Sequence, residues 1–180
     1  DLGLLMPYAF LAFLQWRKEW LEETEHTYDE MQRLLKQIGV QKDYVEWRAY
    51  VPLVNGVFYL GRRNPERALQ EFRNVQIDGH ESYDSVLLTL MLICKTELDL
   101  RGTVPAEDVS NLVRVLDYVA QNEHILTAYA PDFESVLKHF VERGIHTERF
   151  EKALQQATQE PISKPSYHIH VITMGDAPQI

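Results

Sequence analysis

The sequence has one cysteine, Cys94, and fewer basic than acidic side chains. No disulfide can form within the chain, so the cysteine count favours a reducing, cytoplasmic setting. The 18 lysines and arginines stand against 27 aspartates and glutamates, which leaves a net charge of −9. A nucleic-acid-binding face needs clustered positive charge to displace counterions. We therefore expect no direct contact with nucleic acid.

The sequence also lacks the short motifs of common enzymes, namely GxSxG, a Walker-type phosphate loop, GxGxxG and HExxH. Cys94 lies in an apolar segment without an activating neighbour and is interpreted as a small buried side chain. Glu22, Glu23 and Glu25 are typical of a solvated helix face rather than of an acid–base pair. We predict no catalytic residue, no metal site and no cofactor, and we expect a protein that is not an enzyme.

Long apolar runs are missing as well. The first sixteen residues, DLGLLMPYAFLAFLQW, are shorter than a membrane-spanning helix, and Pro7 interrupts them. A signal peptide would need a basic start, whereas the chain begins with Asp1. We expect a core-facing helix here and no membrane partner. Because the first residue is not methionine, we also expect the chain to be part of a larger polypeptide.

Apolar residues that recur every three or four positions predict a succession of helices. The first two are separated by a break at 24–27, where Thr27 and Glu30 form the capping-box pattern S/T-x-x-E. One helix of about thirty residues is the alternative. The expected helices span residues 7–21, 27–38, 42–60, 65–76, 82–100, 105–119, 131–141 and 147–157.

Polar residues, proline and glycine mark where these helices begin, bend and end. Asp43 can cap the helix at 42–60, and Pro52 inside it predicts a kink or a short interruption. Gly61 is expected to end that helix in a left-handed turn. Gly39, Gly102 and Gly144 are expected to end three other helices.

The stretch from 51 to 75 carries a more specific pattern. Gly56 is followed by Tyr59, Ala68 and Phe72 at spacings of three, nine and four residues. Between the two halves, Asn64 can act as an N-cap and Pro65 fits the first helical position. This spacing resembles one tetratricopeptide repeat, in which the small residue lets the partner helix approach. Asn55, like Pro52, stands where that family usually has a large apolar residue.

The resemblance implies a peptide-binding site on the concave side of the first helix of the hairpin. The expected site consists of the apolar residues Tyr50, Leu53, Val57 and Leu60, with Arg48, Arg62 and Arg63 positioned to meet an acidic peptide. The alternatives are that these apolar residues are buried against neighbouring helices, and that these arginines cap helices or pair with glutamates.

The pattern of helix, glycine, short loop and capped helix repeats along the chain. We predict an all-α domain over 1–160, built of about four stacked antiparallel hairpins in a curved, tetratricopeptide-like superhelix. Residues 161–180 are expected to form an extended tail, because 167–174 alternate like a strand. His168 and His170 fall on one face of such a strand, but two ligands do not make a metal site. The tail is expected to lie along its own scaffold or a neighbour's, which would allow self-association.

Helical repeats bind other proteins. We therefore predict a scaffold that binds a protein or peptide. A ligand-sensing regulatory domain that controls an attached effector is the alternative, and a helical enzyme is the least favoured one.

Overall fold

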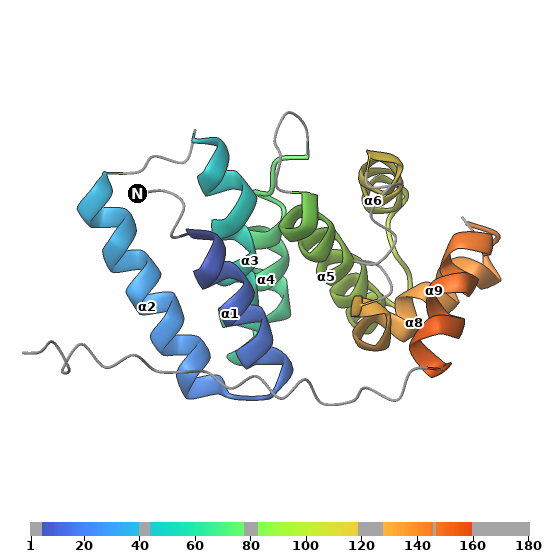
Figure 1. The fold of residues 1–180 in the computed structure, drawn as a ribbon, viewed down its shortest axis with the longest axis horizontal. Coiled ribbons are helices and arrows are strands. Elements are labelled where there is room, and N and C mark those ends of the chain that lie inside the picture. The colour runs from blue at the N-terminus through green and yellow to red at the C-terminus, as the bar shows by residue number, and fades with distance from the viewer. Residues whose placement is uncertain (1–4, 40–43, 78–82, 119–127, 146, 160–180) are drawn as a thin grey trace, which may run out of the picture.

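The computed structural model describes residues 5–39, 44–77, 83–118, 128–145 and 147–159. Every regular element in these ranges is a helix, which confirms the all-α prediction for this part of the chain (Figure 1). The elements are α1 (Leu5–Arg17), α2 (Leu21–Ile38), α3 (Val45–Gly61), α4 (Pro65–Phe72), α5 (Tyr83–Arg101), α6 (Ala106–Tyr118), the 3-10 turn η2 (Ala130–Phe133), α8 (Glu134–Glu142) and α9 (Thr147–Gln159).

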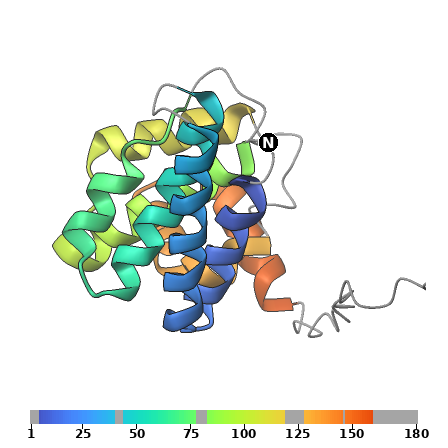
Figure 2. The same cartoon turned by 90° about the vertical axis from the view of Figure 1, so that its left-hand side faces the viewer.

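Helices that follow one another in the sequence pack together. α1 packs against α2 and α3, and α3 packs against α4. α5 contacts α3, α4 and α6, while α8 packs against α9. The buried side chains form one continuous apolar cluster that runs from α1 to α9. Figures 1 and 2 show that α2 is the outermost helix at one end of the molecule.

The first segment forms two helices, as predicted, but the break between them was predicted at the wrong place. It lies at residues 18–20, where Glu19 has a φ of 59°. Thr27 is buried inside α2, and its hydroxyl donates a hydrogen bond to Gln15 Oε1 at 2.7 Å. Thr24 donates to the carbonyl of Trp20 at 2.8 Å, four residues back. These threonines satisfy their hydroxyls inside the α1–α2 pair, so they do not cap a helix.

The α3–α4 hairpin forms as predicted, and Gly56 and Phe72 meet at its seam. A Cβ added at Gly56 would overlap the ring of Phe72, which is fully buried. The Asn64 side chain accepts from the Arg67 N–H at 3.1 Å, and Pro65 opens α4, both as predicted. The left-handed turn was predicted at Gly61, but it occurs at Arg63, with a φ of 55°. α3 continues through Gly61, and the Arg63 N–H then closes the turn onto the Leu60 carbonyl at 2.9 Å.

Other helix boundaries test the remaining sequence signals. Gly39, Gly102 and Gly144 adopt φ values of 66°, 67° and 69°, and each follows a helix as predicted. α3 runs without interruption across Pro52, so the predicted interruption is absent. Asp43 lies outside the described residues.

A buried charge cluster joins α4 to α5 and α6. Arg73 pairs with Glu97 at 2.5 Å and with Asp108 at 2.9 Å. The Glu97 side chain is 1% exposed and also pairs with Arg101. Because a buried carboxylate is costly unless it is paired, Arg73 and Arg101, whose side chains are 45% and 43% exposed, compensate the buried charge of Glu97.

The tail predicted at 161–180, with its strand-like stretch and His168 and His170, lies outside the described residues. The domain boundary at 160 and self-association through the tail stay predictions.

Candidate functional site

Three of the residues expected to line a concave binding surface lie in the core. Tyr50 is 8% exposed, and Leu53 and Val57 are fully buried. α1, α4 and α5 pack against α3, and Ser85 of α5 donates a hydrogen bond to the Ala49 carbonyl at 2.9 Å. The prediction that these three side chains face a ligand is wrong, because neighbouring helices already cover them.

The other four predicted residues do not form one surface. Leu60 is half-buried and lines a cavity of about 140 Å³ against α1 and α5. Arg62 pairs with Glu25 and lies 4.9 Å over the ring of Phe58, as the alternative of surface pairing describes. Arg63 occupies the exposed left-handed turn, and half-buried Arg48 accepts a backbone hydrogen bond from Gln76 at 3.2 Å.

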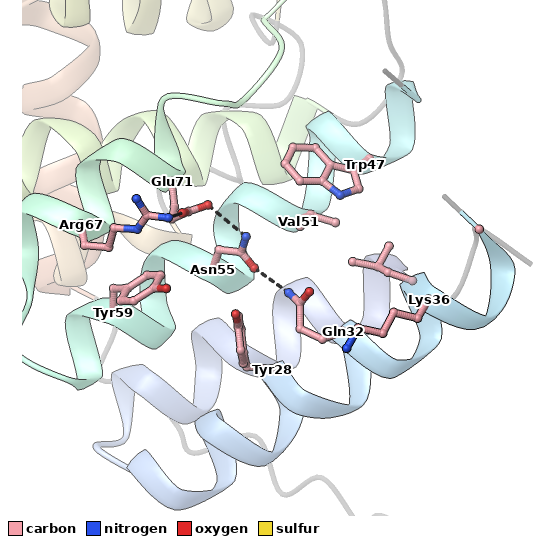
Figure 3. A pocket seen from close by; sticks show the side chains of 11 residues that line it. Tyr28, Gln32, Lys36, Trp47, Val51, Asn55, Tyr59, Arg67 and Glu71 are labelled. Carbon is pink, nitrogen blue, oxygen red and sulfur yellow. Dashed lines mark hydrogen bonds and ion pairs between the residues drawn. The ribbon is translucent and has the colours of Figure 1, made fainter. Parts of the chain in front are cut away.

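A groove of about 490 Å³ instead lies between α2, α3 and α4 (Figure 3). Each helix contributes side chains at four-residue spacing, which places them on one face of that helix. None of the seven predicted site residues lines this groove. The three stripes are Tyr28, Gln32 and Lys36 from α2, Trp47, Val51, Asn55 and Tyr59 from α3, and Arg67 and Glu71 from α4, with Leu35 and Gly39 at one end.

A chain of polar contacts crosses the groove from α2 to α4 (Figure 3). Gln32 Nε2 donates to Asn55 Oδ1 at 3.1 Å, and Asn55 Nδ2 donates to Glu71 Oε2 at 3.1 Å. The other oxygen of Glu71 pairs with Arg67 at 2.7 Å. Because an ionised carboxylate only accepts, this arrangement fixes which way the Asn55 amide points.

Aromatic side chains cover the Arg67 end of the groove. Tyr28 stacks on Phe58 with ring centroids 4.0 Å apart, and Phe58 meets Tyr59 edge-on at 5.1 Å. The Arg67 guanidinium lies 5.5 Å from the centre of the Tyr59 ring. Burial raises the pKa of Tyr28, and the nearby Tyr59 and Glu71 raise it further. The Tyr28 hydroxyl therefore keeps its proton at neutral pH and can donate a hydrogen bond.

The sequence contained a signal for this groove that the search for a concave surface missed. Asn55 is a polar residue in the apolar helix α3, at a position where the tetratricopeptide family usually has an apolar one. Trp47, Val51, Asn55 and Tyr59 recur every fourth residue and define one face of that helix. A polar residue on an otherwise apolar stripe indicates either a buried partner or a binding surface.

The described residues that line the groove include polar and aromatic side chains but no histidine or cysteine. The described residues contain no cluster of three or more His, Cys, Asp or Glu side chains that could hold a metal ion. Burial raises the pKa of the Cys94 thiol, which lies in the core away from the groove. What the groove does offer is hydrogen-bond donors, aromatic rings and one fixed ion pair.

None of the helices in the described ranges combines the length and the apolar character needed to span a bilayer. Comparison with protein-family models, with curated proteins and with solved structures finds no match to this chain.

Proposed function

We propose that this chain is a helical scaffold of the tetratricopeptide-like kind, and that it binds a segment of another protein in the groove between α2, α3 and α4. The observation that carries the proposal is the hydrogen-bonding capacity that the groove leaves unused. One N–H of Gln32 donates to Asn55. The carbonyl oxygen and the second N–H of Gln32 have no hydrogen-bond partner among the described residues. The hydroxyls of Tyr28 and Tyr59 likewise make no hydrogen bond within the described part of the chain.

A polypeptide backbone matches this set of groups. Each residue of an extended segment presents one N–H donor and one carbonyl acceptor, and the Gln32 amide can satisfy both. Tyrosine rings give contact area at low cost in side-chain entropy, which suits them to protein recognition. Because Asn55 and Glu71 hold Gln32 in place, the amide is oriented before the ligand arrives, and less entropy is lost on binding.

The proposal retains the finer predictions made from the sequence. It includes the curved superhelix of stacked hairpins, a scaffold that is not an enzyme, and a cytoplasmic location in keeping with the single buried cysteine. The seam between Gly56 and Phe72 supports the repeat-like reading of α3 and α4.

A ligand-sensing domain is the second candidate. The groove volume of about 490 Å³ falls in the range of small-molecule sites. A small ligand, however, is usually enclosed, whereas this groove is open to the surface of the molecule. The open shape favours a chain that runs through it.

Selection of a random phage-displayed peptide library on the folded protein tests the proposal. Gln32→Ala and Tyr28→Phe change only the groove, while Gln37→Ala and Tyr44→Phe make the same changes at exposed positions outside it. We expect selected peptides to bind the wild type and both control variants, and to bind both groove variants more weakly. Peptides that bind all five proteins equally would place the binding surface elsewhere. If no peptide is selected, the peptide-binding proposal is wrong and the small-molecule alternative takes its place.

A further inference from the structure

The charges along α2 are sorted by sign. Its acidic residues lie within the first ten of its 18 residues, from Glu22 to Glu30, and its basic residues Arg33 and Lys36 follow. This order is favourable to the helix dipole, which is positive at the N-terminus and negative at the C-terminus. The groove runs along the half that ends in the basic residues.

Lys36 is the one groove cation that carries no carboxylate partner within the described ranges. Arg67 is paired with Glu71 at 2.7 Å, and Arg33, next to the groove on α2, is paired with Glu30 at 2.5 Å. Lys36 is exposed and makes no ion pair with any described residue. The protein as a whole carries a net charge of −9, so an unpaired cation in the groove is a local exception.

Buried apolar side chains form the wall of the groove at the Lys36 end. Leu35, Trp47 and Val51 line this end, and Figure 3 shows Trp47 and Val51 across from Lys36, with Arg67 and Glu71 at the opposite end. Leu35, Trp47 and Val51 are 8%, 7% and 1% exposed, so the ammonium group of exposed Lys36 is the accessible group at this end. Between the two ends, the unused N–H of Gln32 adds another donor.

We propose that the groove takes an extended, acidic protein segment, with a carboxylate side chain on Lys36 and the backbone of the segment on Gln32. This inference rests on the proposed function and names the partner chemistry of the same groove. The Lys36 ammonium group and the second N–H of Gln32 are donors without a partner among the described residues, and each oxygen of the Glu71 carboxylate already accepts from Asn55 or Arg67. An acceptor-rich, acidic ligand satisfies those donors, whereas a basic segment would meet Lys36 with like charge.

The experiment compares peptides selected from the random library with matched neutral versions, in which each Glu or Asp is replaced by Gln or Asn. Affinities are measured by fluorescence polarisation with wild type, with Lys36→Gln and with Lys138→Gln. Lys138 lies on α8 and pairs with Glu134, so its variant makes the same change of charge away from the groove.

We expect the selected peptides to contain an acidic residue. Lys36→Gln should weaken them about three- to fivefold, as for a partly exposed ion pair, and Lys138→Gln should leave affinity unchanged. The neutral peptides should bind the wild type and Lys36→Gln equally well, and added salt should reduce only the binding that depends on Lys36.

Two other outcomes separate the two proposals. In one outcome, the selected peptides need Gln32 and Tyr28, contain no acidic residue and bind Lys36→Gln as tightly as the wild type. This result would overturn the acidic-ligand inference and leave the groove as a binding site. Peptides that bind independently of Gln32 and Tyr28 would overturn the proposed function, and the inference that rests on it.

Discussion

Gly56 of α3 lies against the ring of Phe72 of α4 with no room for a Cβ, and replacing this glycine with alanine should destabilise the protein. In an ordinary helix interior, Gly→Ala is stabilising by about 0.5–1 kcal/mol, because alanine loses less backbone entropy. At Gly56, however, the added Cβ would overlap three atoms of the Phe72 ring, which is fully buried and has no room to withdraw. Overpacking a core costs about 1–3 kcal/mol, and the extent of this overlap indicates the upper end. The expected net loss is about 2 kcal/mol.

Gly61→Ala is the matched control in the same helix. Its added Cβ would lie 3.2 Å from the flexible end of Leu21, which is 47% exposed and can move aside. We expect Gly61→Ala to be neutral or to stabilise by up to about 1 kcal/mol. Urea unfolding followed by circular dichroism gives both free energies.

A double-mutant cycle assigns the loss to the Phe72 contact. Phe72→Ala alone should cost about 3–5 kcal/mol, and it should cost less when Gly56 is already alanine, because the new methyl group fills part of the cavity. If Gly56→Ala stabilises the protein as much as Gly61→Ala does, the helices are not in contact at this point and the hairpin seam is misplaced.

Two further predictions concern charged side chains. Arg73→Ala should destabilise the protein by about 1–3 kcal/mol, because Asp108 and the buried Glu97 each lose an ion-pair partner. Arg33→Ala breaks an exposed pair and should change stability by less than about 1 kcal/mol, so equal effects of the two variants in urea unfolding would contradict this prediction. Burial raises the pKa of Asp132 above its ordinary 3.8, an effect that Arg17 opposes, so the folded state holds this proton more tightly than the unfolded state. The stability of the wild type relative to Asp132→Asn should therefore fall as pH rises from 3.8 through the raised pKa, and a difference that grows with pH over that window would refute the assignment.

Local signals in the sequence were sufficient for most of the helices. Gly39, Gly102 and Gly144 end helices where a left-handed residue is needed, and Asn64 with Pro65 begins α4, because these properties depend on the backbone of a few neighbouring residues. The capping-box pattern at Thr27 gave a wrong prediction because tertiary contacts determine which group the threonine hydroxyl bonds to. The hydroxyl of Thr27 has Gln15, twelve residues away, as its partner, and no local rule includes that residue.

The candidate site was harder to predict for a related reason. The four-residue spacing of Trp47, Val51, Asn55 and Tyr59 identifies a helix face, but it does not say whether another helix covers that face. The opposite face of α3, with Leu53 and Val57, follows the same rule and is covered by its neighbours. Only the positions of α2 and α4 leave Asn55 and Tyr59 half-buried at a groove, while Trp47 and Val51 on the same face are buried.

The central claim is that the protein binds other chains in the groove between α2, α3 and α4. Two-dimensional ¹H–¹⁵N NMR spectra, recorded as a selected peptide is titrated in, test it most directly. The claim predicts that the shifted amide signals cluster at residues 28–36, 47–59 and 67–71, and that Gln32→Ala weakens the response while Gln37→Ala does not. Shifts that cluster on another surface, such as the exposed face of α1 that includes Leu11 and Leu14, would contradict it.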